Sequence, residues 1–368
     1  MSIHPELLDL LQRLVAFRTD ATETAQAAWL QTLTAGWGGC ARVDEVLPGR
    51  VNFLATFAGR DPSRSILFEA HGDTVGGEVP LRLDAAAGVL HGRGACDTKG
   101  AMAAILFAIR RVLAEQGRPP VTVHVAATCK EESGCEGVRA LLASGFRADM
   151  AVVGEPTRLT IIRAHKGAWR CRIVTRGVAA HSSAPDRGVN AIYRMRCVLE
   201  VLEQHYPAAL ATLRDPLLGA PTMSVGTIRG GMAVNVVPDQ CEIEVDWRIV
   251  PGQRGEELLA DLQTRLPDAE IVPCESYPPF READDSPVVT RMQRACAAAL
   301  GQAAPLGAVP WAANAGFLRE AGIPCVIFGP GDIAQAHTAG EFVELRQVEQ
   351  AAEVYRRMML GTQERQMT

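Results

Sequence analysis

The sequence lacks long hydrophobic runs, runs of basic residues and C-x-x-C pairs. No uninterrupted apolar run reaches the roughly 20 residues that a membrane-spanning helix needs, so we expect no membrane partner. The net charge is −5 and no Lys/Arg run can neutralise a phosphate backbone, which disfavours nucleic acid as a partner. The Lys99-Gly100 pair lacks the spacing of a phosphate-binding P-loop, so a nucleotide site is not expected. The ten cysteines have neither zinc-ribbon nor thioredoxin-like spacing, and we expect reduced thiols.

The composition that is present is typical of globular proteins. Apolar residues make up 48% and charged residues 21% of the chain, and no biased tract suggests disorder. A length of 368 residues fits two domains of the usual size, roughly 100 to 200 residues each. The first 17 residues carry Glu6, Asp9 and Arg13 among leucines, a pattern typical of an amphipathic helix and not of a secretory signal. We therefore expect a cytoplasmic protein.

Strand-like and helical segments alternate in the first part of the chain. Apolar strand-like runs are expected at 51–57, 65–71, 121–128 and 150–156, and a helix at 102–116. Such alternation is typical of a largely parallel sheet covered by helices. The sequence therefore predicts an α/β fold with a mainly parallel sheet flanked by helices.

The pattern changes at Gly167. From there the expected order is β-α-β-β-α-β, which is typical of a small ferredoxin-like module. The segment SYPPFREADDSP, rich in proline and acidic residues, is a plausible connector back to the first style. We predict one α/β domain formed by 1–166 and 281–368, and an inserted domain formed by 167–280.

Five potential metal ligands lie at the ends of predicted strands or in the loops that follow them. They are His71, Asp97, Glu132, Glu155 and His337. Open α/β sheets place their active sites at this position. Histidines with carboxylates suit Zn²⁺, with Co²⁺ or Mn²⁺ as possible substitutes. With one carboxylate bridging, the five ligands can hold a pair of ions, and we predict two Zn²⁺ as cofactors.

Asp73 and Glu131 neighbour these ligands in the sequence. Asp73 lies two residues after His71, so on extended backbone it can accept the hydrogen bond from the free ring nitrogen of His71. Glu131 precedes Glu132, and on extended backbone the two side chains face opposite directions. One can bind metal while the other faces substrate. We predict that Glu131 is the general base that accepts the proton of the attacking water and passes it to the leaving amine.

These motifs resemble one family over nearly the whole chain. The matching segments are HGDTV, GRGACDTKG, EESGCEG, GEPT, HKG, AHSSAPDRGVNAI, NVVPD, DWRIVPG and GPGDIAQAH. They are similar to the two-zinc deacylases and exopeptidases that include acetylornithine deacetylase, succinyl-diaminopimelate desuccinylase and carboxypeptidase G. The resemblance implies that 1–166 and 281–368 form a zinc-exopeptidase-like catalytic, metal-binding domain. It also implies that 167–280 form an inserted ferredoxin-like dimerisation or lid domain, and that the protein is a homodimer.

The resemblance also implies how the ligands are shared. Asp97 would bridge the two zinc ions. The ligands that complete one site are His71 and Glu155, and those that complete the other are Glu132 and His337.

Three further residues take catalytic roles by resemblance. Glu131 is the acid/base, Asp73 orients the first histidine ligand, and His181 reaches the active site of the partner subunit, where it steadies the tetrahedral oxyanion. Without the resemblance, a histidine at position 181 would be interpreted as a surface residue.

Substrate contacts come from the resemblance as well. Arg248 resembles an arginine that holds the substrate α-carboxylate, a role suited to a bidentate guanidinium, and Asn235 and Gly331 resemble substrate-contacting positions. Two departures bear on specificity. The segment between the first histidine and the bridging aspartate is short, and Ala312-Ala313-Asn314 replaces the family's usual Gly-Thr-acidic run.

The segments HKG, EESGCEG and GPGDIAQAH favour the acetylornithine deacetylase branch. The expected activity is hydrolysis of the amide bond of a small N-acyl-L-amino acid. A dipeptidase, a carboxypeptidase or a succinyl-diaminopimelate desuccinylase with the same chemistry is the alternative. A catalytically silent scaffold on the same fold is a third hypothesis, which the presence of all five ligands and the base disfavours.

Overall fold

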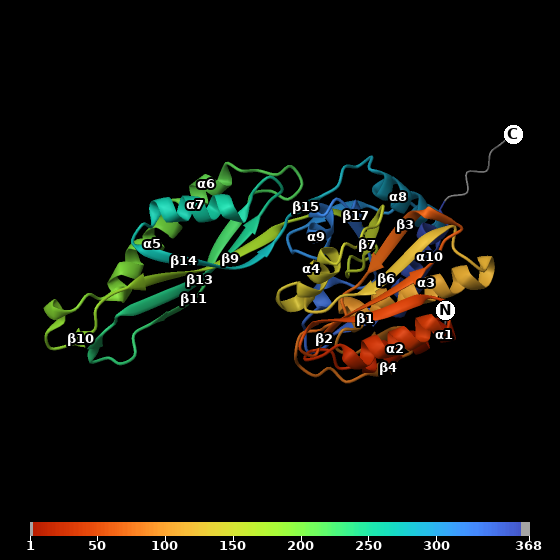
Figure 1. The fold of residues 1–368 in the computed structure, drawn as a ribbon, viewed down its shortest axis with the longest axis horizontal. Helices are drawn as coiled ribbons and strands as arrows, with labels where there is room; N and C mark the ends of the chain where they lie inside the picture. Colours follow the sequence, from red (N-terminus) through yellow and green to blue (C-terminus); the bar gives the residue numbers. More distant parts are fainter. Residues whose placement is uncertain (1–2, 362–368) are drawn as a thin grey trace. The chain divides into compact units, whose positions relative to one another are not determined.

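The structure is a computed structural model that describes residues 3–361. It consists of two compact units, each described here by itself (Figure 1). Unit 1 comprises Met1–Arg163, Glu282–Gly307 and Phe317–Thr368, and unit 2 comprises Ala164–Arg281 and Ala308–Gly316. The segment Ala308–Gly316, which the sequence assigned to the catalytic domain, groups with unit 2. Backbone pairing contributes to this, because the Lys166 amide donates to the Val309 carbonyl (3.2 Å).

Most strands of a large mixed sheet belong to unit 1. Its order is β1-β2-β6-β3-β7-β17-β8-β15, and β16 pairs with β8 off this path. The strands are β1 (Cys40–Leu47), β2 (Arg50–Phe57), β3 (Asp61–Glu69), β6 (Val121–Ala127), β7 (Ala151–Val153), β8 (Ile161–His165), β15 (Phe280–Arg281), β16 (Leu306–Val309) and β17 (Cys325–Ile327). The pairs β6–β3, β3–β7 and β7–β17 are parallel, whereas the pairs on either side of them are antiparallel. The α/β class is confirmed, with the parallel strands in the middle of the sheet.

Helices of unit 1 bury their apolar faces against one another and against this sheet. They are α1 (Pro5–Ala16), α2 (Thr24–Ala35), α3 (Gly100–Gln116), α4 (Glu136–Ala143), α8 (Pro287–Leu300), α9 (Ala315–Glu320) and α10 (Leu345–Leu360). Contacts run from α1 to α3, from α3 to α10 and from α10 to α8, whereas α2 and α4 contact β1 and β2. A small sheet of order β18-β5-β4 completes the unit, with β4 (Arg82–Asp84), β5 (Val89–His91) and β18 (Phe342–Glu344).

Local sequence signals explain where these helices begin and end. In α8 the Ser286 side chain accepts a hydrogen bond from the Val289 amide, Pro287 occupies the first turn, and Gly301 ends the helix with φ 74°. In α1, His4 caps the helix, and the leucines on one face, Leu7, Leu10, Leu11 and Leu14, are buried in the core. None of the helices within residues 3–361 is long and apolar enough to span a membrane.

Unit 2 has the β-α-β-β-α-β order expected of a ferredoxin-like module. Its four-stranded sheet has the order β11-β13-β9-β14, with β9 (Gly167–Arg176), β11 (Thr222–Gly230), β13 (Gln240–Ile249) and β14 (Ala269–Tyr277). Helices α5 (Ala191–Gln204) and α7 (Gly255–Arg265) pack on it beside α6 (Tyr206–Ala211), and β10 (Ala180–His181) pairs with β12 (Val236–Val237). The core gathers Trp169, Trp247, Met195 and Leu262. Strand β11 stands at an edge of this sheet (Figure 1).

Candidate metal centre

The five ligand candidates come together in unit 1 as two overlapping groups. His71, Asp97 and Glu155 form one group, and Asp97, Glu132 and His337 form the other. In each group the candidate ligand atoms lie within 4.8 Å of one another. One oxygen of Asp97 is 2.9 Å from Nε2 of His71, and the other is 3.3 Å from Nε2 of His337. Asp97 therefore faces both groups, one with each oxygen.

Parallel strand ends supply most of these side chains. His71 follows β3, Glu132 follows β6 and Glu155 follows β7. The three strands are neighbours in the order β6-β3-β7 and run parallel, so their carboxyl ends meet at one edge of the sheet. Three separate chain segments end at this edge, and this brings together residues that are far apart in sequence.

A loop supported by a buried carboxylate presents Asp97. The loop turns at Gly94, whose φ is 79°, and the peptide bond after Asp97 is cis. Oε1 of Glu341 accepts hydrogen bonds from the amides of Cys96 (3.0 Å) and Asp97 (3.2 Å), while Oε2 pairs with Arg93 (2.8 Å). Sequence reasoning missed Glu341, and its position four residues after His337 was the only signal.

The contact between His71 and Asp73 differs in detail from the expected one. Nδ1 of His71 lies 2.9 Å from the main-chain carbonyl of Asp73 and 3.6 Å from the nearer carboxylate oxygen. The carboxylate instead accepts the amides of Glu131 (3.0 Å) and Glu132 (3.2 Å). Asp73 thus orients the imidazole through its carbonyl and fixes the glutamate pair through its side chain.

The glutamate pair is not extended, as the sequence suggested, but lies in a 3₁₀ turn, Glu131–Ser133. Lys130 before it has a left-handed backbone, with φ 57°. This turn lets the Asp73 side chain bind both amides at once. Burial, followed by the nearby charges of Glu132 and Asp73, raises the pKa of Glu131 well above its usual value.

Arg50 and Glu23 support the position of the Asp73 carboxylate. The Arg50 guanidinium pairs with the buried Glu23 carboxylate and lies 3.8 Å from that of Asp73. Glu23 also accepts the Val51 amide (3.2 Å). Neither residue was singled out from the sequence, because an arginine and a glutamate 27 positions apart carry no local signal.

The electrostatics of the cluster fit bound cations. Among the described residues, no Lys or Arg side chain pairs with Asp97, Glu132 or Glu155. Burial, followed by repulsion from neighbouring carboxylates, raises the pKa of Glu155 well above its usual value. Hydrogen bonds to Asp97 and Glu132 raise the pKa of His337 to about 10. Protons and metal ions compete for such atoms, so a site that attracts protons this strongly also suits divalent cations.

The residues assigned to substrate contacts are divided between the units. Gly331 is buried in unit 1 with φ 93°, and a Cβ there would meet Sγ of Cys96 at 2.6 Å. Its amide donates to the Gln347 side chain and its carbonyl accepts the Arg158 amide. These contacts are a structural reason for a glycine at position 331, independent of any contact with substrate.

In unit 2, His181 is exposed on β10, and its Nδ1 lies 2.7 Å from the Ser183 hydroxyl. The Asn235 carbonyl accepts a hydrogen bond from the Ser182 amide (3.0 Å), so His181 and Asn235 lie on adjacent segments of the backbone. Arg248 on β13 pairs through Nε with Asp246 (2.8 Å).

A mixed α/β sheet that gathers candidate histidine and carboxylate ligands at the carboxyl ends of its parallel strands is typical of a metal-dependent hydrolase. Comparison with protein families makes the class specific. A model described as peptidase family M20/M25/M40 matches residues 67–361, and the chain belongs to this family.

Individual relatives agree with this assignment. An acetylornithine deacetylase of Myxococcus xanthus is 37% identical over 321 residues, which cover 82% of this chain and 81% of the relative. A tripeptidase of Staphylococcus aureus superposes with a TM-score of 0.80 at 22% identity, covering 97% of this chain and 98% of its own. A dinuclear metal-binding M20 peptidase of Bacillus subtilis superposes with a TM-score of 0.68 at 15% sequence identity, covering 96% of each chain. The protein is therefore an enzyme that hydrolyses amide bonds with bound metal.

Proposed function

We propose that the enzyme removes the acyl group from a small N-acyl-L-amino acid, as an acetylornithine deacetylase does, with two Zn²⁺ ions in the cluster. The observation that carries the proposal is the pair of ligand groups that share Asp97 beside Glu131. The acetylornithine deacetylase of Myxococcus xanthus supports the choice of substrate class.

The ligand roles follow from the two groups. In the proposal, Asp97 would be held in common by the two ions, since each of its oxygens faces one group. His71 and Glu155 would complete the first site, while Glu132 and His337 would complete the second. When bound, the ions polarise the amide carbonyl and lower the pKa of water from 15.7 to about 7.

Glu131 moves the proton in this proposal. It accepts a proton from the attacking water and delivers it to the leaving amine nitrogen. The Asp73 carboxylate fixes the Glu131 main chain by accepting a hydrogen bond from its amide. Within residues 3–361, the Glu131 carboxylate forms no ion pair with a Lys, Arg or His side chain. Asp73 thus contributes in two ways, by holding the base in place and by orienting His71 through its carbonyl.

Unit 2 contributes recognition in the proposal. The Arg248 guanidinium binds the substrate α-carboxylate and Asn235 is a further substrate contact, while Gly331 is a substrate contact from unit 1. His181 acts on the oxyanion in the partner subunit. The exposed position of His181 on β10 supports its role. The role of Arg248 is supported by its guanidinium, whose one ion pair within residues 3–361 uses Nε and Asp246.

We also propose that the enzyme is a homodimer formed through unit 2. Strand β11 has one unpaired edge, and exposed edge strands are prone to pair with another chain. Large apolar side chains around it are exposed, with Tyr193 at 73%, Met232 at 86% and Ile228 at 56% of their full accessible surface. A two-fold dimer would cover this surface on both copies. A cytoplasmic location stays a prediction.

Hydrolysis of a substrate panel tests the proposed function. The zinc-loaded protein is assayed with N-acetyl, N-succinyl and N-formyl amino acids and with dipeptides, each followed by release of free amine. Preference for N-acetyl-ornithine or a close analogue supports the deacetylase. A dipeptide preference moves the protein to the exopeptidases of its family, and preference for a succinylated substrate moves it to the desuccinylases.

A further inference from the structure

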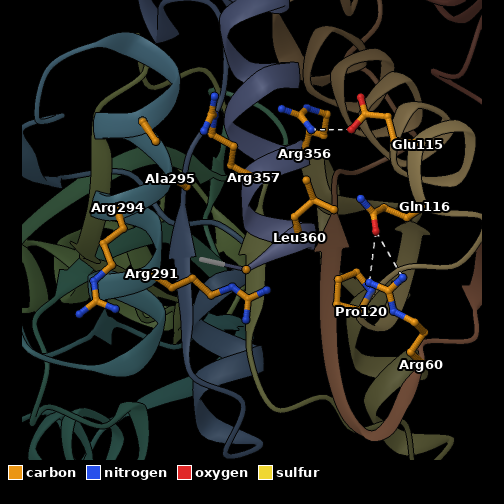
Figure 2. Close-up of a pocket in the computed structure, with 12 residues that line it drawn as sticks. Arg60, Glu115, Gln116, Pro120, Arg291, Arg294, Ala295, Arg356, Arg357 and Leu360 are labelled. Atoms are coloured by element: carbon orange, nitrogen blue, oxygen red, sulfur yellow. Dashed lines mark hydrogen bonds and ion pairs between the residues drawn. The ribbon is translucent and has the colours of Figure 1, made fainter. Parts of the chain in front are cut away.

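A strongly basic cavity lies in unit 1, away from the metal centre. It has a volume of about 590 Å³ and is lined by five arginines and a single acidic residue, Glu115. The arginines are Arg60, Arg291, Arg294, Arg356 and Arg357. In Figure 2 the Arg291 side chain extends toward the middle of the view, whereas that of Arg294 points toward the lower left. An adjoining cavity of about 690 Å³ shares two of them and adds Arg64.

The basic cavity is found at the amino ends of the parallel strands. Arg60 and Pro120 directly precede β3 and β6, whereas the candidate metal ligands follow the carboxyl ends of these strands. Helix α3 spans the same distance, since it begins just after Asp97 and ends at Gln116 in the cavity wall. Its 17 residues correspond to about 25 Å. The basic cavity is therefore separate from the metal centre.

Two of the arginines have an obvious structural role. Arg356 pairs with Glu115 and Glu353, and Arg357 pairs with Glu353. Their charges are balanced within the fold, so they do not by themselves indicate a ligand.

The other four arginines are not balanced in this way. Arg60 donates to the neutral Gln116 amide, and Arg291 donates to the Met358 carbonyl. Among residues 3–361, no carboxylate lies within ion-pair distance of Arg60, Arg64, Arg291 or Arg294. Burial, followed by the charge of Arg64, lowers the pKa of Arg291. Four cationic side chains thus form no ion pair within residues 3–361, while the walls of the two cavities contain two acidic residues, Glu115 and Asp285.

We propose that this cavity binds a small anion with two adjacent phosphate groups. Planar guanidinium groups bind phosphate oxygens bidentately, and several arginines around one hollow match a ligand with more than one phosphate. The volume suits a metabolite, since small-molecule sites measure roughly 300 to 1,000 Å³. Apolar wall residues such as Leu360 and Ala295 leave room for an uncharged portion.

Pyrophosphate titration tests the proposal, with calorimetry on the full chain in buffer without added divalent metal. We compare the unaltered protein with the double variant Arg60→Gln/Arg294→Gln, in which both substituted side chains are exposed. A matched double variant, Arg196→Gln/Arg254→Gln, removes the same charge from exposed positions of unit 2. The cavity variant should bind pyrophosphate at least about tenfold more weakly, whereas the matched variant should bind normally.

A metal-ligand variant separates this site from the catalytic centre. His71→Ala should retain pyrophosphate binding, because its substitution does not touch the cavity. Binding that His71→Ala abolishes and the cavity variant retains would place the anion at the metal centre and overturn the proposal. Equal weakening in the matched variant, citrate binding as tightly as pyrophosphate, or no binding at all would overturn it as well.

Discussion

Replacing Glu131 with Gln separates the chemical step from metal binding. Glutamine keeps the size of the side chain but cannot accept a proton at neutral pH. General acid–base catalysis by one positioned group contributes about 10² to 10⁴ in rate. At about 1.4 kcal/mol per factor of ten, the substitution should raise the barrier by about 3 to 5 kcal/mol. We therefore expect kcat to fall by a factor of about 10² to 10⁴.

The same structure predicts that the fold and the metal content survive. The contact that fixes the turn uses the Glu131 amide and the Asp73 carboxylate, and glutamine preserves it. The substitution also removes a negative charge that is repelled by Glu132, Asp73 and Asp97. The melting temperature of the metal-free variant should therefore equal or exceed that of the unaltered protein.

The assay combines kcat for an N-acetyl amino acid, zinc stoichiometry by elemental analysis, and thermal unfolding. Glu136→Gln is the matched control, since it removes one negative charge from the same segment, where Glu136 faces Lys130. It should retain activity. A Glu131→Gln enzyme with full zinc and near-normal kcat would refute the role of Glu131 as the base.

Further predictions concern pH, metal and assembly. Burial lowers the pKa of His124 to about 4, whereas the unfolded chain titrates near 6.5, so the unfolded state binds the extra proton and stability falls on acidification. We expect the free energy of unfolding, measured with urea, to fall between pH 6.5 and pH 5 in the unaltered chain. In His124→Gln this fall should be smaller by about 2 kcal/mol, and an equal fall in both proteins would contradict the prediction. Chelation should lower the melting temperature, because a metal at 1,000 times its Kd stabilises by about 4 kcal/mol; an unchanged melting curve after verified metal removal would argue against the site. Tyr193→Asp/Met232→Asp should yield monomers in light scattering, and persistent dimers would exclude this apolar surface as the interface.

Much of the fold is visible in local patterns. The alternating segments that predicted strands correspond to β2, β3, β6 and β7, because buried parallel strands require nearly continuous apolar runs. The order of unit 2 followed from the same kind of signal. The apolar run at 324–330 likewise predicts β17, whereas β1 was not predicted, since it is largely exposed.

The grouping of Ala308–Gly316 with unit 2 was not foreseen. This segment follows β16 in the sequence, but its backbone bonds to Lys166, more than a hundred residues earlier. No periodicity within a segment reveals such a long-range pairing. The atypical Ala312-Ala313-Asn314 lies in this segment, so its departure from the family pattern belongs to unit 2.

The sequence by itself determined the chemistry: which side chains follow which strands, and that histidines and carboxylates at those positions suit divalent metal. Tertiary structure decided how they are supported. The carboxylate of Asp73 binds two amides while its carbonyl binds the imidazole, and Glu341 secures the loop of Asp97. Only the folded chain also gathers Arg60 and Arg291 in one cavity. Residue types are encoded locally, whereas the partner of a buried hydrogen-bonding group depends on segments that meet only after folding.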